Sequence, residues 1–284
     1  MGVSPTTPSP VAARAAYHTH VQRTVAAAFG LPAGRVRRGA DRPAIAPALY
    51  FGRLDFRGSP KEWSRLTSAR SMREVDMAKG TLIAAMKIGR AAEDEFHDWY
   101  DTEHLPERQR VPGFLVCQRW IGAEDPTVSV ATYDLENIAV LKSPAYLAIA
   151  GENLSPWSKR ITARVERLMR FEGDQIVPGD QLPPTRAGGL LLNAMHIAPE
   201  FEAEFNEWYD KEHIPALAAV PGVIAARRFR GTSGNRKYVA LYHLQSPEVQ
   251  ASAEWKQARQ SDWTSRLQPH FRDHLRLVLQ PRRA

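Results

Sequence analysis

The sequence predicts an α+β protein in which two tandem copies of one small module form a single pseudo-two-fold barrel. Two observations carry this prediction. A motif at residues 95–106 recurs at 204–215, and each copy is flanked by the same order of apolar runs and turns. Hydrophobic residues make up 43% of the 284-residue chain, enough to supply a core for both copies.

The repeated motif reads EFHDWYDTEHLP in the first copy and EFNEWYDKEHIP in the second, so that Trp208 lies 109 residues after Trp99. The same offset relates the two Val-Pro-Gly turns at 111–113 and 220–222. Trp263 follows Trp157 by only 106 residues, so one loop of the second copy is three residues shorter. Self-similarity at a fixed spacing is the signature of a repeated structural unit.

Each copy predicts the same elements in the same order. An apolar strand leads into a helix with an acidic first turn, which we expect to end before Pro106 or Pro215. A hairpin follows, then a Ser-Pro pair that starts further helix, and finally an alternating strand, clearest at Phe271–Leu279. The other strands are expected at 81–88, 114–121 and 128–135, and at 190–197, 223–230 and 238–244.

The order βαββαβ is the ferredoxin-like plan. Helices cover one face of each four-stranded sheet, and the other face also needs burial. Packing one sheet against the other within the chain satisfies both copies, which predicts one pseudo-dimeric α/β barrel.

The predicted organisation has four parts: an N-terminal arm at 1–76, a first repeat at 77–175, a linker at 176–187 and a second repeat at 188–284. The arm holds 12 basic and five acidic residues, while the remainder is neutral with 26 of each. The excess charge therefore belongs to an arm of disordered composition, and the repeats carry no electrostatic signature of nucleic-acid binding. An alternative is that Met77 is the true start and the arm an extension of the gene model.

The motif Trp-Tyr-Asp-x-Glu-His-(Leu/Ile)-Pro followed by Val-Pro-Gly resembles the dimeric α/β-barrel superfamily, nearest its EthD-like members. The resemblance covers both repeats but not the arm. It implies the barrel fold and a ligand held between the repeated helix and the sheet. It does not imply one activity, because the superfamily includes isomerases, cyclases, dehydratases, cofactor-free monooxygenases, haem enzymes and proteins without known activity.

A helical wheel at about 100° per residue places a carboxylate, Glu103 or Glu212, on the apolar face of the repeated helix. Burial and the helix C-terminus both raise a carboxyl pKa, as a general acid or base requires. Each carboxylate precedes a histidine that could share its work. The candidate catalytic residues are Glu103, His104, Glu212, His213 and His196. The candidate substrate-binding residues are Trp99, Tyr100, Arg119, Trp208, Tyr209 and Arg228.

A structural interpretation stands beside the catalytic one, because a symmetric barrel needs its fold-defining contacts twice and its chemistry once. In that case Glu103 pairs with an arginine such as Arg119 or Arg160, and His104 caps terminal carbonyls. The tryptophans then belong to the core, and each tyrosine hydroxyl needs a buried partner.

Positions at which the two copies differ are better indicators of function than positions that both copies share. His196 stands where the first copy has Lys87, which makes it the leading single candidate. His97, Asp101 and His104 share one side of the helix, but three ligands from one straight helix are hard to aim at a single ion. We therefore predict no metal site. The single cysteine, Cys117, excludes a disulfide framework.

The sequence thus favours a cytoplasmic small-molecule enzyme without an organic cofactor. It would act by acid/base chemistry, as an isomerase, cyclase or dehydratase, or by oxygenating an aromatic or ketone-type metabolite. The alternative is a non-catalytic protein that binds a hydrophobic metabolite or haem, and a third is an interaction module. We expect the partner to be a small-molecule substrate, and we expect no binding to nucleic acid or membrane. The expected assembly is a monomer (pseudo-dimer) or a weak homo-oligomer.

Overall fold

The computed structural model describes residues 78–234 and 236–282. The predicted arm at 1–76 and the alternative start at Met77 lie outside the described residues. The predicted strands are all present, with ends that differ from the expected ones by at most four residues.

The first repeat runs from β1 to β4. Its elements are β1 (Gly80–Lys87), α3 (Glu93–Trp99), η1 (Tyr100–His104), α4 (Leu105–Gln109), β2 (Phe114–Gly122), β3 (Val128–Leu135), η2 (Ile138–Lys142), α5 (Pro144–Leu147), η3 (Gly151–Asn153), α6 (Pro156–Thr162) and β4 (Glu166–Val177).

The second repeat runs from β5 to β8. Its elements are β5 (Gly189–Ile197), η4 (Pro199–Phe201), α7 (Glu202–Trp208), η5 (Tyr209–His213), α8 (Ile214–Ala218), β6 (Val223–Gly234), β7 (Tyr238–Leu244), η6 (Pro247–Ala251), α9 (Ala253–Ala258), α10 (Asp262–Leu267), η7 (Gln268–His270) and β8 (Phe271–Pro281).

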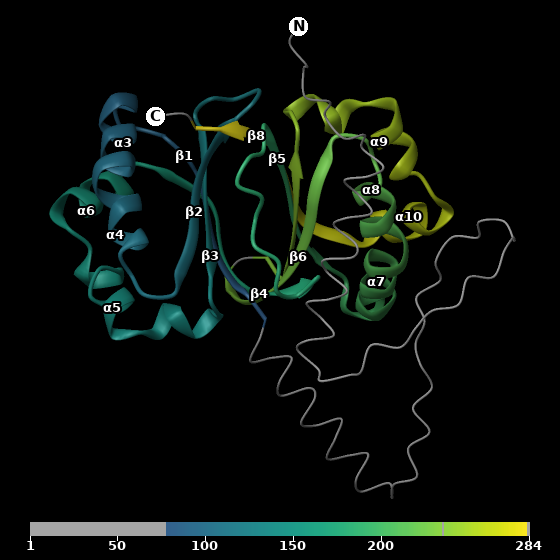
Figure 1. The fold of residues 1–284 in the computed structure, drawn as a ribbon, viewed down its shortest axis with the longest axis horizontal. Helices are drawn as coiled ribbons and strands as arrows, with labels where there is room; N and C mark the ends of the chain where they lie inside the picture. Colours follow the sequence, from purple (N-terminus) through teal and green to yellow (C-terminus); the bar gives the residue numbers. More distant parts are fainter. Residues whose placement is uncertain (1–77, 235, 283–284) are drawn as a thin grey trace, which may run out of the picture. The chain divides into compact units, whose positions relative to one another are not determined.

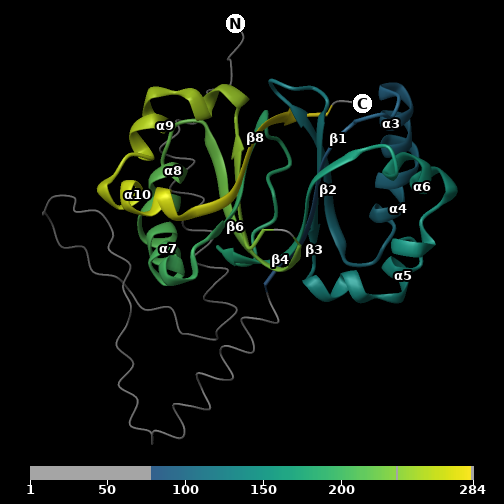
Figure 2. The same ribbon diagram turned by 180° about the vertical axis from the view of Figure 1, so that it is seen from behind.

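The eight strands close into one barrel in the order β1-β3-β2-β8-β5-β7-β6-β4, which confirms the predicted fold class. Two pairings join the repeats. β4 and β6 pair from Phe171 opposite Gly234 to Val177 opposite Arg228, whereas β2 and β8 pair only through Trp120–Gly122. The helices of each repeat lie outside the barrel, on opposite sides of it (Figures 1 and 2).

Alternate residues of each strand face opposite sides of the barrel wall, so the apolar residues divide into three clusters. One cluster fills the barrel interior and includes Ile83, Phe171 and Phe229. The other two lie between the wall and the helices, one in each repeat. The layer outside the wall is therefore where each repeat can form a pocket of its own.

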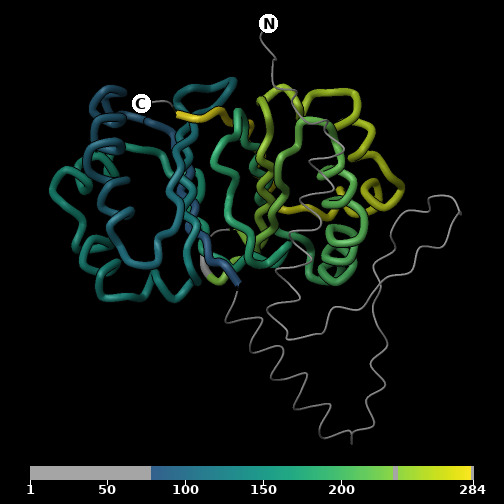
Figure 3. The backbone as a smooth tube through the Cα atoms, viewed as in Figure 1, coloured from purple at the N-terminus to yellow at the C-terminus, as the bar shows by residue number. Residues whose placement is uncertain are grey.

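The chain passes from the first repeat to the second through a linker that lies between the two halves of the barrel (Figure 3), where its Gln181 and Pro184 carbonyls accept hydrogen bonds from Arg227 and Gln118. Gln175, which is buried, holds this segment. Its side-chain oxygen accepts hydrogen bonds from the N–H groups of Gly179 and Gln181, and its amide donates to the Gln181 carbonyl.

The expectation that the repeated helix ends before its proline is wrong. In both repeats an α-helical turn passes through a π-helical segment, η1 or η5, into a further α-helix that contains the proline near its start. Proline lacks an N–H and crowds the carbonyl four residues earlier. In a π segment each N–H bonds to the carbonyl five residues earlier, as Leu105 N–H does to Tyr100 O. This wider turn accommodates the proline while the helix continues.

Candidate functional site

A cavity of about 480 Å³ lies between the barrel wall and the helices of the first repeat. We call it the first-repeat cavity. Its apolar walls come mainly from β1, α3 and the segment around α5, and its polar groups from η1, α4, β3, α5, α6 and β4. The polar and aromatic lining residues are Trp99, Tyr100, His104, Arg108, Tyr133, Tyr146, Thr162, Arg167, Arg170 and Glu172.

The π segment places His104 at the wall of this cavity. Its ring packs on Trp99, with ring centroids 4.3 Å apart, and meets the edge of Tyr100 at 5.2 Å. Nδ1 is enclosed and has no hydrogen-bond partner among the described residues. Burial, followed by the positive charges of Arg108 and Arg119, lowers the pKa of His104 well below its usual value, so the ring is neutral at pH 7.

Arg108 brings a buried positive charge to the same cavity. Its guanidinium donates to the Glu107 carboxylate at 2.7 Å and to the Ile149 carbonyl at 3.3 Å. Arg170 also lines the cavity and bonds to the Tyr146 hydroxyl at 3.4 Å and to Glu172. Apolar walls with a few fixed polar groups are the usual composition of a small-molecule site.

Two phenols complete the polar side of the cavity. The Tyr133 hydroxyl lies near that of Tyr100. It has no hydrogen-bond partner among the described residues. Burial raises the pKa of Tyr100 and raises that of Tyr133 well above its usual value. Both phenols therefore stay protonated and can donate to a bound oxygen.

At two positions that match the cavity lining, the second repeat has buried apolar side chains. Leu217 stands 109 residues after Arg108, Trp255 stands 109 residues after Tyr146, and both are buried. Trp255 meets the ring of Tyr242 at 5.3 Å. His213 keeps the stacking seen in the first repeat, 4.2 Å from Trp208, and burial lowers its pKa to about 3. The repeats therefore share a framework and differ in the polar lining.

The two candidate carboxylates bond to hydroxyl groups rather than to an arginine. Glu103 Oε1 accepts from Ser155 at 2.5 Å and from Ser158 at 3.2 Å, and Glu212 Oε1 accepts from Ser261 at 2.5 Å. Ser155 and Ser261 cap the N-termini of α6 and α10. Each glutamate therefore ties the repeated helix to the last α-helix of its own repeat, and neither carboxylate lies among the residues that line the first-repeat cavity.

The arginines proposed as partners of Glu103 have other contacts. Arg160 donates to Glu95 at 2.8 Å. Arg119 donates to Asp101 at 2.5 Å, and its guanidinium lies 4.1 Å from the ring centroid of Tyr100.

The second repeat reproduces the Arg119 arrangement. Arg228 donates to Asp210 at 3.1 Å and covers the ring of Tyr209 at 4.3 Å. Because the arrangement occurs twice, it supports the fold and positions the tyrosines in both repeats.

His196 lies apart from the first-repeat cavity. It is at the end of β5, partly exposed, with Nε2 4.0 Å from the Asp273 carboxylate. The three residues considered for a metal also diverge: His97 and Asp101 contact Arg119, whereas His104 packs on Trp99. Among the described residues no group of three or more histidine, cysteine or acidic side chains could hold a metal ion.

Four of the lining residues were not predicted from the sequence: Arg108, Tyr133, Tyr146 and Arg170. Arg108 carried a usable signal, because the repeat places Leu217 at the matching position. The others become candidates only when the topology brings β3, α5 and β4 together.

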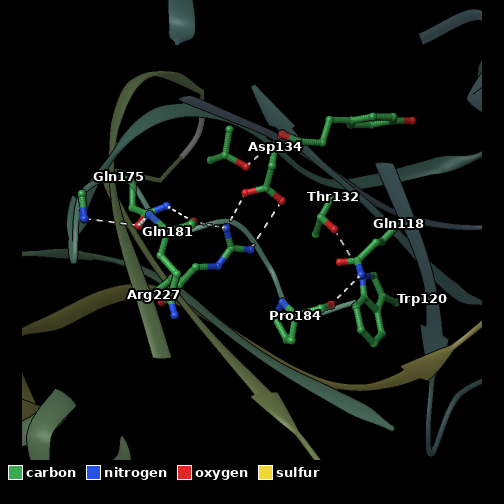
Figure 4. Close-up of polar contacts among 11 residues, drawn as sticks. Gln118, Trp120, Thr132, Asp134, Gln175, Gln181, Pro184 and Arg227 are labelled. Carbon is green, nitrogen blue, oxygen red and sulfur yellow. Dashed lines mark hydrogen bonds and ion pairs between the residues drawn. The ribbon is translucent and has the colours of Figure 1, made fainter. Parts of the chain in front are cut away.

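A buried ion pair inside the barrel also escaped prediction. Asp134 on β3 binds Arg227 on β6 through both carboxylate oxygens, and neither side chain is exposed by more than 1% (Figure 4). Arg227 also donates to the Gln181 carbonyl of the linker at 3.3 Å. The matching residues are Gln118 and His243, so this contact joins the two different repeats and occurs once.

No family model and no curated protein matches the sequence. Among solved structures, 64 chains match. An anthrone oxidase-like protein covers 74% of this chain and 93% of its own, with 10% identity and a TM-score of 0.51. A provisionally named monooxygenase from Fusobacterium nucleatum covers 72% and 92%, with 11% identity and a TM-score of 0.49.

A mutant chlorite dismutase from Candidatus Nitrospira defluvii covers 72% of this chain and 92% of its own, with 11% identity and a TM-score of 0.46. At such identities the comparisons establish the shared α/β-barrel fold and nothing finer. Among the described residues, no helix is both long and apolar enough to span a membrane.

Proposed function

We propose that this chain is a small-molecule enzyme that works without an organic cofactor and removes a proton from an aromatic or ketone-type substrate in the first-repeat cavity. One observation supports this most. A neutral histidine, His104, lines a largely apolar cavity together with the buried cation Arg108. A neutral imidazole can accept a proton, and a fixed positive charge stabilises the enolate or phenolate that remains.

The geometry supports a separate role for each of these residues. Nδ1 of His104 is enclosed, so Nε2 is the atom left to accept the proton. The lowered pKa makes the resting ring a weak base, and the anion formed beside it offsets this weakness by stabilising the imidazolium. Arg108 and the protonated phenols of Tyr100 and Tyr133 can hold the substrate oxygen.

The same anion serves each reaction class considered. Reprotonation at another atom is an isomerisation, loss of a leaving group is a dehydration, and attack on an internal carbonyl is a cyclisation. Reaction with molecular oxygen is a cofactor-free oxygenation. Anthrone illustrates the last case, since anthrone and one O₂ give anthraquinone and one water.

Anthrone is a suitable probe, because a structural neighbour is named an anthrone oxidase-like protein and because its methylene proton is acidic. In D₂O without oxygen, the wild type should exchange that proton, as followed by NMR. With oxygen, anthraquinone absorbance should appear. His104→Gln should slow exchange by about 10²–10⁴-fold, while the matched variant His213→Gln should keep the wild-type rate.

Exchange no faster than in buffer, or equal losses in both variants, would contradict the proposal. The result with oxygen then separates oxygenation from proton transfer alone, because a chain that exchanges the proton without forming anthraquinone belongs to the isomerase-type classes.

Haem binding is the second candidate, and it also rests on His104. An imidazole at an apolar wall suits an axial ligand, and Arg167 and Arg170 in the same lining suit propionate carboxylates. Haem bound there would supply redox chemistry. Titration should give a Soret band that His104→Ala removes and His213→Ala keeps, and a flat titration of the wild type would remove haem as a candidate.

A further inference from the structure

A second cavity lies where the barrel wall is least complete. β2 pairs with β8 only through Trp120–Gly122, and beside this short seam is a cavity of about 790 Å³. It lies between β2, η1, the linker and the end of β8, and we call it the seam cavity. The lining residues used below are Asp101, Leu105, Arg119, Trp120, Arg186, Ile224 and Arg282.

The charges in the seam cavity do not balance. Asp101 is its single acidic lining residue, and it already receives a hydrogen bond from Arg119 at 2.5 Å and lies 3.8 Å from Arg282. Arg186, from the linker, forms no ion pair with any described residue. Three arginines therefore face one carboxylate, which leaves the cavity positive.

Polar atoms beside the seam cavity are also incompletely satisfied. The Nε atoms of Arg119 and Arg282 are enclosed and have no hydrogen-bond partner among the described residues. Buried polar groups in proteins almost always have a partner, and an acceptor bound in the seam cavity could supply one. The Nε atoms of Arg227 and Arg228 in the second repeat are unpartnered as well, so this feature alone does not mark a site. The pKa of the neighbouring His97 is lowered by burial and then by Arg282 and Arg119, which is consistent with a positive local potential.

The two arginines at the matching positions of the second repeat each have an acidic partner. Arg227, which replaces Gln118, is neutralised by Asp134, and Arg228 bonds to Asp210 at 3.1 Å and to Asn206 at 2.6 Å. Each of these two cations thus has a carboxylate of its own. The additional charges of Arg186 and Arg282 are therefore what distinguishes the seam cavity.

We propose that the seam cavity binds a small apolar molecule that carries a carboxylate or phosphate group. Arginine recognises both groups through paired N–H donors, and Arg186 and Arg282 are placed to supply them. Leu105, Trp120 and Ile224 form the apolar side that accommodates the remainder of the ligand. This site is distinct from the first-repeat cavity and does not depend on the function proposed for it.

Three probes with one ring system test the proposal: 1-naphthoate, 1-naphthyl phosphate and neutral 1-naphthalenemethanol. Binding is measured by calorimetry on the full chain and on Arg108→Leu/Tyr146→Trp, which removes a cation from the first-repeat cavity and enlarges one of its rings, as in the second repeat. At least one of the two anions should bind to the wild type and to the double variant, and the site that both share should be the seam cavity. The neutral probe should bind at least about tenfold more weakly than that anion. Whichever anion binds more tightly identifies the headgroup.

Arg186→Gln/Arg282→Gln should weaken anion binding by about tenfold or more. Arg110→Gln is the matched control, because Arg110 is an exposed arginine of the same repeat that does not line the seam cavity, and it should leave the affinity unchanged. The proposal is overturned if neither anion binds to the Arg108→Leu/Tyr146→Trp variant. It is also overturned if the neutral probe binds equally well or the double variant keeps full affinity.

Discussion

The ion pair between Asp134 and Arg227 gives a quantitative test of how the two repeats are joined. Arg227→Gln installs the residue that the first repeat has at the matching position, and it leaves the Asp134 carboxylate 1% exposed without its cation. Removing one partner of a buried pair costs about 3–5 kcal/mol. We therefore expect the free energy of unfolding in urea to fall by that amount at pH 7.

The penalty should depend on pH in a defined direction. Burial raises the pKa of Asp134 above its usual value even with Arg227 present, and Arg227→Gln removes the charge that opposes this rise. A carboxyl whose pKa is higher in the folded state destabilises the fold increasingly as pH rises above its unfolded pKa. The cost of Arg227→Gln should therefore shrink as the pH is lowered from 7 toward that pKa.

Two further variants complete this test. Glu207→Gln breaks the exposed pair with Lys211 and should cost only about 0.3–0.5 kcal/mol. Asp134→Leu/Arg227→Met replaces both charges with apolar groups and should recover most of the loss. The reasoning is refuted if Arg227→Gln costs no more than Glu207→Gln, or if its cost is the same at every pH.

Three other predictions follow from single sites. Glu103→Gln and Glu212→Gln should each keep activity and lose no more than about 1 kcal/mol, because the amide oxygen can still accept from the capping serine; a large loss of turnover with an intact fold would show that the carboxylate is catalytic. Burial holds the pKa of both His213 and His243 at about 3. Below about pH 6.5 these two rings therefore take up a proton in the unfolded chain but not in the folded one. The free energy of unfolding should fall by about 1.4 kcal/mol per pH unit for each ring near pH 5. His213→Phe should remove one such contribution in urea titrations, and an unchanged slope would contradict this. Burial raises the pKa of Cys117 to about 12, so Ellman's reagent should react far more slowly with the folded chain than with the unfolded one, and equal rates would rule this out.

The repeat made the fold predictable, because one pattern read twice determines both the elements and their pairing into a barrel. The path of the chain through Pro106 was not predictable in the same way. A helical wheel assumes a regular α-helix, and the π segment from Tyr100 to His104 shifts every later side chain around the axis. Glu103 consequently meets serines rather than the apolar face.

The polar lining was predictable only in part, because its members come from distant segments. Arg108 could have been found by comparing it with Leu217 across the repeat. Asp134 and Arg227 lie 93 residues apart on strands of different repeats, so their contact depends on how the barrel closes. No local sequence pattern predicts how the strands of the two repeats align in the closed barrel.

The central claim is that the first repeat holds the functional site while the second repeat is packed with Leu217 and Trp255. A crystal structure of the protein soaked with anthrone tests this most directly. The account predicts anthrone between the barrel wall and the helices of the first repeat, in contact with His104 and Arg108. Anthrone bound in the second repeat, or a first-repeat cavity that stays empty while anthrone binds elsewhere, would contradict it.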